Sequence, residues 1–193
     1  MSIVRRTLIA ATAAAAFAAP FASFAQALAE DARAMHLAAG LPERRFKADR
    51  SFVTDLDEAI EARLRSLIRA RYPSHGIWGE EGGVEAAQAD WLWVIDPIDG
   101  TAAYSVGVPV YGTLIALCHK GEPVLGLIDL PALDRCVLGV AGAPTLENGQ
   151  PMHCSGCVEL AVAVASVCNP DFFPHVQRAV LARLEQMTTW RIY

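Results

Sequence analysis

Apolar residues recur every three or four positions over one long segment of the chain. They lie at Leu56, Ile60, Leu64, Leu67 and Ile68. This spacing predicts an amphipathic helix that begins near Thr54, and the Tyr72-Pro73 step is expected to end it because a residue before proline avoids helical geometry. The arginines of this segment are expected on its solvated side. They are Arg63, Arg65, Arg69 and Arg71.

Short continuous apolar runs follow this helix and predict strands. The runs cover residues 91–95, 110–118, 123–129 and 136–140, and Asn148-Gly149 is a strong hairpin signal. Farther along, residues 158–167 resemble a strand, 172–187 a helix and 190–193 another strand. Helices, then an antiparallel meander, then a helix predict an α+β fold with layered elements.

The N-terminal segment has two interpretations. Arg5-Arg6 precede an uncharged, alanine-rich run that reaches an A-x-A sequence at Ala25-Gln26-Ala27, which is typical of a twin-arginine export signal. The alternative is an additional N-terminal helix in a cytoplasmic protein, which we favour. Residues 1–27 therefore form an export signal or an extra helix, and residues 28–193 form the main domain. A stable membrane span is not expected, because alanine dominates the run.

Composition and charge narrow the classes of function that the chain can have. The chain has 193 residues, of which 53% are hydrophobic, and this suffices for one substantial core. The net charge is −5 and no block of lysines and arginines is present, which argues against nucleic-acid binding. The five histidines share no metal-binding spacing, and we expect each of them, His36 included, at the surface or in a loop.

The most informative stretch is Asp96-Pro97-Ile98-Asp99-Gly100-Thr101, which follows the apolar run at 91–95. Two carboxylates at the end of such a run are costly unless a positive group lies between them. Pro97 fixes its own φ and lacks an N–H, so the stretch is expected to form a stiff turn. Gly100 and Thr101 permit close approach of an anion to backbone N–H groups. Together these features indicate Mg²⁺ and phosphate.

Two further acidic positions belong with this stretch, although each also has a simpler explanation. Thr54-Asp55-Leu56-Asp57 matches a capping box, so Asp57 taken alone is best explained as a helix cap. Glu80 could belong to a solvated turn, and Asp96 and Asp99 could be ordinary residues at a strand end. The combination favours chemistry, because Glu80 and Asp96 each follow a tryptophan-containing apolar strand and precede glycine.

These residues carry a family resemblance. Gly79-Glu80-Glu81 and the stretch from Trp93 to Thr101 resemble the two signature motifs of the inositol monophosphatase-like, Mg²⁺-dependent phosphatases. The resemblance runs from about Phe24 to Tyr193. It implies that the metals bind Glu80, Asp96, Asp99 and the Ile98 carbonyl. It also implies that Asp57 and Thr101 activate the attacking water, and that the Gly100 and Thr101 amides hold the phosphate.

The resemblance also suggests a substrate and a missing part. Residues 112–117 and 169–173 are most similar to the bacterial histidinol-phosphatase branch, which implies hydrolysis of histidinol phosphate. The alternatives are an inositol-phosphate or sugar-phosphate phosphatase, or a non-catalytic remnant. The fold expected is the N-terminal half of the family's layered α/β sandwich, C-terminally truncated at Tyr193. An open apolar flank then favours aggregation or a homodimer.

Overall fold

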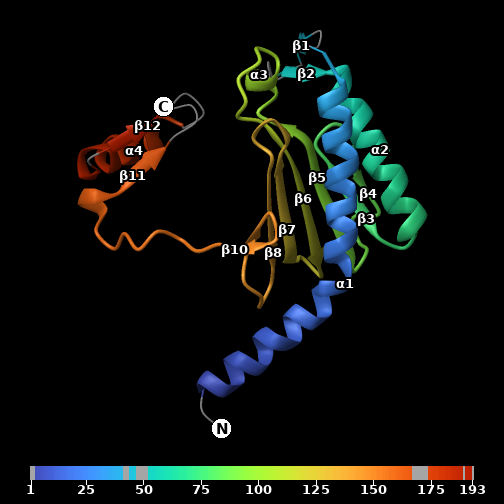
Figure 1. Cartoon of the computed structure of the whole chain (residues 1–193), viewed down its shortest axis with the longest axis horizontal. Helices are drawn as coiled ribbons and strands as arrows, with labels where there is room; N and C mark the ends of the chain where they lie inside the picture. Colours follow the sequence, from blue (N-terminus) through green and yellow to red (C-terminus); the bar gives the residue numbers. More distant parts are fainter. Residues whose placement is uncertain (1–2, 41–43, 47–51, 167–173, 189, 193) are drawn as a thin grey trace. The chain divides into compact units, whose positions relative to one another are not determined.

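A computed structural model describes residues 3–40, 44–46, 52–166, 174–188 and 190–192. The chain divides into two compact units, Met1–Met152 and His153–Tyr193. The first unit contains helices α1 (Ile3–Ala38), α2 (Asp55–Arg71) and the short α3 (Thr101–Tyr104). Two short strands, β1 (Arg44–Phe46) and β2 (Phe52–Thr54), pair with each other, and β2 leads directly into α2 (Figure 1).

An eight-stranded sheet forms the centre of this first unit. Its spatial order is β10-β9-β8-β7-β6-β5-β3-β4. All neighbours are antiparallel except β3 and β5, which are parallel. The strands are β3 (Gly76–Gly79), β4 (Gly83–Glu85), β5 (Trp91–Asp99), β6 (Gly112–His119), β7 (Glu122–Leu130), β8 (Arg135–Val140), β9 (Leu146–Glu147) and β10 (Gln150–Pro151). A 3₁₀ turn, Pro131–Leu133, joins β7 to β8. The predicted meander is therefore present, and Asn148-Gly149 forms its last hairpin, with both residues at positive φ.

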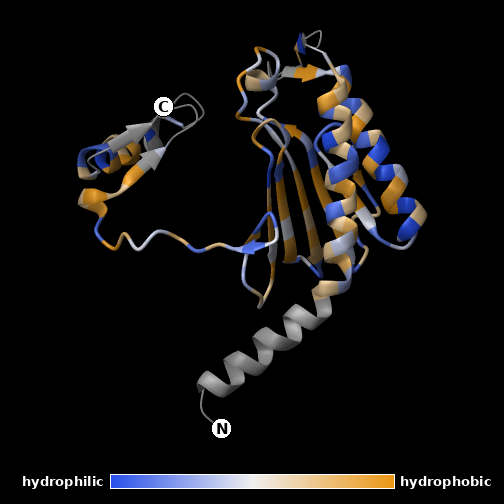
Figure 2. Ribbon diagram, viewed as in Figure 1, coloured by the Kyte–Doolittle hydropathy of each residue, from blue (hydrophilic) through white to orange (hydrophobic). Residues whose placement is uncertain are grey.

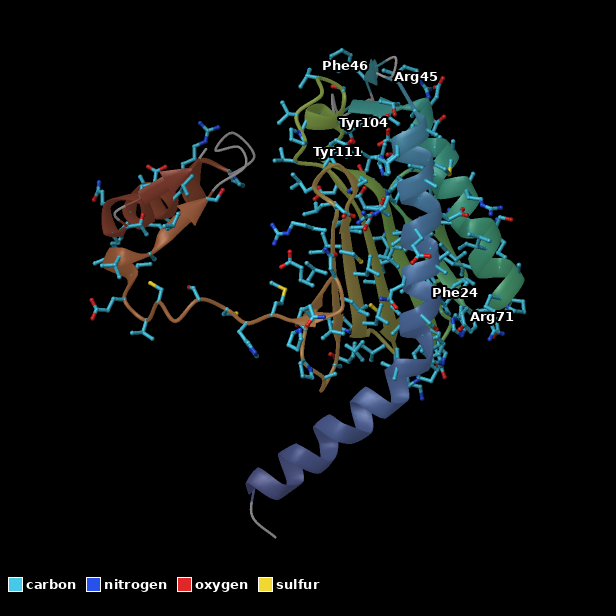
Figure 3. All side chains as sticks on the ribbon, viewed as in Figure 1. Phe24, Arg45, Phe46, Arg71, Tyr104 and Tyr111 are labelled. Carbon is cyan, nitrogen blue, oxygen red and sulfur yellow. The ribbon has the colours of Figure 1, made fainter. Side chains whose placement is uncertain are left out.

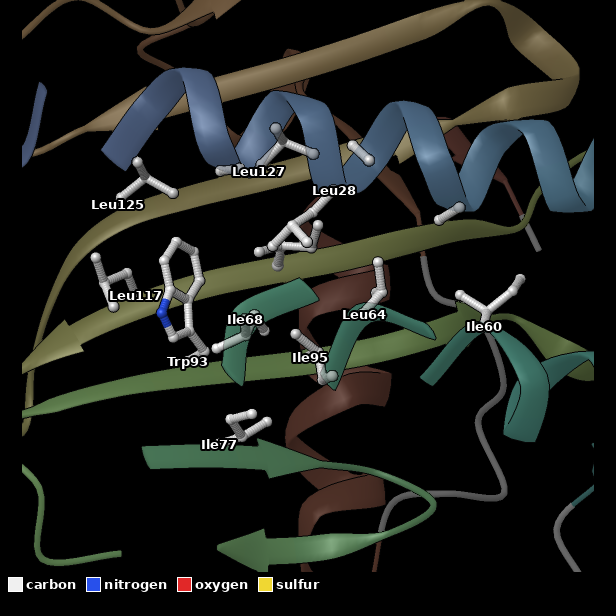
Figure 4. Packing of buried hydrophobic residues seen from close by; sticks show 14 of the residues in the cluster. Leu28, Ile60, Leu64, Ile68, Ile77, Trp93, Ile95, Leu117, Leu125 and Leu127 are labelled. Carbon is white, nitrogen blue, oxygen red and sulfur yellow. The ribbon is translucent and has the colours of Figure 1, made fainter. Parts of the chain in front are cut away.

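The hydrophobic core lies between the sheet and helices α1 and α2. Helix α1 contacts β6, β7 and β8, whereas α2 contacts β3 and β5. Side chains alternate across a strand, so one face of β5, which includes Trp93, meets the helices (Figure 4). The predicted periodicity of α2 places Ile60, Leu64 and Ile68 in this core, each with no exposed surface. Figure 2 shows that hydrophobic residues dominate the central strands of the sheet.

The stretch predicted to be a turn instead continues a strand. Strand β5 extends through Asp99, and its pairing with β6 shifts register between Asp96 and Asp99. Pro97 lies within this interval and cannot donate a hydrogen bond to the ladder, which accounts for a local irregularity at that point. The acidic stretch is therefore a bulged strand end, and the turn begins only at Gly100.

Two polar side chains lie in the core, contrary to expectation. Arg65, predicted on the solvated side of α2, is only 7% exposed because it pairs with the buried Glu61 of the same helix. His36, predicted at the surface, is 3% exposed, because α1 packs it against the Pro97 carbonyl and Thr113. A helical spacing identifies which face is apolar but not which polar residues have partners across that face.

The second unit contains a parallel strand pair, β11 (Val164–Ser166) and β12 (Trp190–Ile192), joined through α4 (His175–Met187). Parallel strands need such a crossover connection. The predicted strand over 158–167 is shorter than expected, since a 3₁₀ turn occupies Leu160–Val162. The described part of the predicted helix is α4, which begins at His175. Residues 167–173, which include part of the histidinol-phosphatase-like sequence, lie outside the described residues.

Helix α1 runs without interruption across the predicted boundary between residues 27 and 28. Ala25 and Leu28, on either side of it, are both fully buried in the core of the first unit. Within the described residues, no helix combines the length and the hydrophobicity that crossing a membrane requires. The division into an N-terminal segment and a main domain stays a prediction, whereas the α+β class is confirmed.

Candidate active site

Glu80 and Asp96 lie side by side because β3 and β5 are parallel neighbours. Gly79 pairs with Ile95, and the Glu80 amide, one residue beyond, donates to the Ile95 carbonyl at 3.2 Å. The Asp96 side chain therefore comes within hydrogen-bonding reach of the Glu80 carboxyl. Burial, the charge and hydrogen bond of Glu80, and the charge of Asp99 together raise the pKa of Asp96 to about 8.

This arrangement fits a divalent cation. Like-charge repulsion disfavours the ionised form of a carboxyl that lies beside two other acids, and a bound cation offsets this repulsion. Among the residues that the structure describes, no three acidic, histidine or cysteine side chains are close enough to hold a metal by themselves. Mg²⁺ does not require such a cage, because it usually keeps several waters and binds one or two carboxylates together with substrate phosphate. The donor set therefore suits Mg²⁺, with carboxylates from Glu80 and Asp96 at its centre.

Asp57 and Thr101 form a second group, although they are 44 residues apart. Asp57 is 1% exposed, and its Oδ1 lies 3.2 Å from the Thr101 hydroxyl. Its Oδ2 accepts from the Thr54 amide at 2.8 Å and from the Thr54 hydroxyl at 2.5 Å, which completes a capping box at the start of α2. Burial raises the pKa of Asp57, although its hydrogen bonds to Thr54 and Thr101 oppose the shift. Asp57 thus completes the capping box of α2 with one oxygen and contacts Thr101 with the other.

Ile98 connects these two groups through its backbone. Its N–H donates to Asp96 Oδ1 at 3.1 Å, and its carbonyl lies 2.9 Å from the Thr101 hydroxyl. The preceding carbonyl, of Pro97, is held in the core instead, by the Thr113 hydroxyl at 2.9 Å and the His36 ring at 3.3 Å. Successive carbonyls of the stretch therefore have different partners, and that of Ile98 is on the side of Thr101.

Gly100 makes the turn from β5 into α3. Its φ is +86°, a left-handed conformation, and a Cβ at this position would lie 2.8 Å from the Val110 carbonyl. Both facts favour glycine. Behind the turn, the rings of Tyr104 and Tyr111 contact each other with centroids 4.9 Å apart (Figure 3). The turn that carries the predicted phosphate-binding amides of Gly100 and Thr101 is thus packed from behind.

A hollow of about 700 Å³ adjoins the acidic pair on the face of the sheet opposite to the helices. Glu80 and Asp96 lie on its wall, and most of the remaining lining is apolar. Two of its large apolar side chains are exposed, Trp78 by 55% and Ile128 by 45%. The acidic pair therefore faces an open, hydrophobic surface of this unit.

Sequence reasoning missed two residues next to the site, Glu61 and Arg65. The Glu61 carboxylate is 2% exposed and accepts hydrogen bonds from the backbone amides of Glu81 and Gly82. A signal was present, because Asp57, Glu61 and Arg65 repeat every four positions beside the apolar stripe of the helix. Acidic and basic residues in that pattern are expected to be buried only when they are paired.

Comparison with known proteins gives a family match over nearly the whole chain. Residues 9–187 match the model of the inositol monophosphatase family. Among curated proteins, the chain is 39% identical over 149 residues to a chloroplastic bifunctional phosphatase, IMPL2, of Arabidopsis thaliana, covering 76% of this chain and 43% of that protein. It is 38% identical over 151 residues to a probable inositol 1-monophosphatase, ImpA, of Mycobacterium tuberculosis, covering 74% and 55%.

Other relatives extend the comparison. A histidinol-phosphatase of Chlorobaculum parvum is 38% identical over 126 residues, covering 65% of this chain and 49% of that protein. The solved structure of an inositol monophosphatase from Zymomonas mobilis superposes with a TM-score of 0.78 at 32% identity, covering 90% of this chain and 68% of that one. The chain thus spans about half the length of these curated relatives, and the predicted layered fold is confirmed over that part.

Proposed function

The chain belongs to the inositol monophosphatase family, and on that premise we propose that it is a Mg²⁺-dependent phosphomonoesterase acting on a small phosphorylated metabolite. The observation that supports this most is the acidic pair beside an open hollow, with the pKa of Asp96 raised to about 8 by burial and its acidic neighbours. Such a site favours a cation, and a cation favours phosphate. Glu80 and Asp96 would hold the metal directly, with Asp99 and the Ile98 carbonyl as the further ligands that the family resemblance predicts, and water and substrate phosphate would complete the set.

The remaining groups then have distinct tasks. A divalent metal bound at this site would neutralise charge on the phosphate and would make its bound water more acidic. Asp57, whose pKa burial raises, is placed to accept a proton from water near Thr101 Oγ1, which lies 3.2 Å from Asp57 Oδ1. Thr101 orients that water through its hydroxyl, while the Ile98 carbonyl at 2.9 Å keeps the hydroxyl in place. The amides of Gly100 and Thr101 bind the phosphate.

For the substrate we favour an inositol phosphate or a related sugar phosphate. Two observations support it: the family match itself and the relative named as an inositol 1-monophosphatase, which aligns with more of the chain than the histidinol-phosphatase does. Histidinol phosphate is the second candidate. It is supported by the 38% identical histidinol-phosphatase and by the resemblance of residues 112–117 to that branch.

Phosphate release from inositol 1-phosphate, a hexose monophosphate and histidinol phosphate tests the proposal, with Mg²⁺ and with a chelator. Release that requires Mg²⁺ and is lost in Asp96→Asn supports the phosphatase, and the relative kcat/KM values rank the substrates. The Arg63→Met variant serves as the control, since its exposed side chain pairs with Asp31 away from the acidic stretch. Mg²⁺ binding without any turnover would instead identify a non-catalytic member.

Two further assignments remain proposals. We favour a cytoplasmic location over export through residues 1–27, and N-terminal sequencing of protein from its native host tests it. A homodimer is supported by the exposed Trp78 and Ile128 around the hollow, since large exposed apolar patches often mark interaction surfaces. Sedimentation of the chain at several concentrations measures whether it self-associates.

A further inference from the structure

A buried carboxylate lies directly beneath the loop that carries Glu80. Glu61, on α2, accepts the Glu81 amide on Oε2 and the Gly82 amide on Oε1, each at 2.7 Å. Arg65, one helical turn later, donates Nε to Oε1 at 2.8 Å and also hydrogen-bonds the Gly83 carbonyl. A charged residue pair on one helix therefore binds three consecutive backbone positions immediately after Glu80.

Two glycines of this loop, Gly79 and Gly82, lie directly against the Glu61 carboxylate. A Cβ on Gly79 would lie 2.2 Å from Glu61 Oε1, and a Cβ on Gly82 would lie 2.7 Å from the same oxygen. Real Cβ atoms essentially never come this close to another atom, and hydrogen bonds to Glu81, Gly82 and Arg65 fix the carboxylate, so glycine lets the backbone approach it while those bonds are kept. The close packing of the Glu61 carboxylate thus accounts for glycine on either side of Glu80-Glu81.

Stability alone is a weak reason for such a pair. Removing two charges from water is expensive, and a buried ion pair is often no better for stability than well-packed apolar residues. The arrangement does have a consequence for Glu80. Glu80 is solvent-exposed, and both it and Asp96 must be ionised to bind a cation, a state in which their like charges repel each other. A loop free to move would let Glu80 move away from Asp96 in that state.

We propose that Glu61 is a positioning residue, which with Arg65 holds the Gly79–Gly82 loop so that the Glu80 carboxylate stays beside Asp96 ready to bind a divalent cation. Arg65 neutralises the charge of Glu61, so the clamp adds no net charge to an already acidic site. Outer partners that orient a metal ligand commonly contribute ten- to hundredfold in metal affinity. This inference rests on the proposed function, because it assumes that the acidic pair binds metal.

Titration of the metal-free 193-residue chain with MgCl₂ by calorimetry tests the proposal without any assay of activity. The variant is Glu61→Gln. Its side-chain NH₂ group would replace one of the two oxygens that accept hydrogen bonds from the Glu81 and Gly82 amides, so one of these amides would face a donor. The first control is Glu58→Gln, the same chemical change on the same helix, at a residue whose exposed partner is Arg45. The second is Leu64→Ala, which perturbs the fully buried core of α2 without touching the loop.

We expect Glu61→Gln to weaken Mg²⁺ binding by roughly tenfold or more, whereas both controls bind within about twofold of the unmodified chain. Binding by Glu61→Gln as tight as that of the controls overturns the inference and leaves the proposed function intact. An unmodified chain that binds no Mg²⁺ overturns both. Hydrogen exchange in the unmodified chain supplies a second measurement if the variant does not fold. Slow exchange at the Glu81 and Gly82 amides supports the clamp, and exchange as fast as in an open loop contradicts it.

Discussion

Replacement of Asp57 by asparagine separates the two tasks that the structure gives this residue. The side chain is 1% exposed, with Oδ2 in the capping box of Thr54 and Oδ1 at 3.2 Å from the Thr101 hydroxyl. Asparagine keeps one oxygen, which can remain at the cap. Its amide nitrogen then takes the place of Oδ1 and donates to the Thr101 oxygen, while Thr101 donates to the Ile98 carbonyl at 2.9 Å. The hydrogen bonds are preserved, but the proton acceptor is lost.

The expected magnitudes follow from these contacts. Burial raises the pKa of Asp57, so the folded protein favours its neutral form, and stability falls as rising pH ionises it. A neutral asparagine avoids that penalty, and we expect the free energy of unfolding at pH 7 to change by less than about 1 kcal/mol. Asp57→Ala leaves Thr54 as the N-cap but removes the acceptor of its buried amide, which should cost about 2 kcal/mol. Loss of a general base should lower kcat by roughly 10²- to 10⁴-fold in both variants.

Urea unfolding gives the free energy of unfolding and phosphate release gives kcat, both measured on the same protein samples. Thr54→Ala is the matched control: it removes the hydroxyl partner of the cap but leaves the contact between Asp57 and Thr101, so it should lose about 1 kcal/mol of stability and little activity. Asp57→Asn that keeps kcat within tenfold of the unmodified chain would refute the role in water activation. A large loss of stability in that variant would refute the exchange of hydrogen bonds described above.

Other parts of the structure give sharp expectations. In urea unfolding, Arg33→Met should cost about 3–5 kcal/mol because it leaves the buried Asp129 without its ion pair. Arg63→Met breaks an exposed pair and should cost much less. Equal losses in the two variants would contradict the buried pairing. The pKa of Asp96 is raised from 3.8 to about 8, so the folded state binds more protons than the unfolded state between these values. The free energy of unfolding of metal-free protein should therefore decrease from about pH 4 to about pH 8, and added Mg²⁺ should reduce that slope; a flat profile would contradict the shift. Gly100→Ala should lose at least about 1 kcal/mol by thermal unfolding, since the left-handed φ of +86° disfavours a side chain; unchanged stability would contradict the strained turn.

Much of the fold follows from local patterns. The apolar spacing of Leu56 to Ile68 predicts α2, and Asn148-Gly149 predicts the last hairpin, because each signal depends on residues a few positions apart. Asp57 was best explained as a cap from its spacing to Thr54, and the structure contains that cap. The family match over residues 9–187 confirms the resemblance carried by the two motifs.

Other features depend on contacts that no local pattern encodes. His36 is buried because its ring nitrogen Nε2 lies within hydrogen-bonding distance of the Thr113 hydroxyl and the Pro97 carbonyl, which are 77 and 61 residues away in the sequence. Arg65 was expected in water because arginine usually is, yet Glu61 and the Gly83 carbonyl bind it in the interior. The acidic stretch was expected to be a turn since Asp and Pro favour turns. Pairing with β6 overrides that preference as far as Asp99. The assigned site residues stay a prediction until metal or substrate is bound.

The central claim is that Glu80 and Asp96 form a cation site, and proton release on Mg²⁺ binding tests it most directly. Calorimetric titration at pH 7 in two buffers of different ionisation enthalpy counts the protons released. Because the pKa of Asp96 is about 8 in the metal-free protein, binding should release about one proton per ion, and Asp96→Asn should abolish this release. Absence of Mg²⁺ binding, or binding without proton release, would contradict the account.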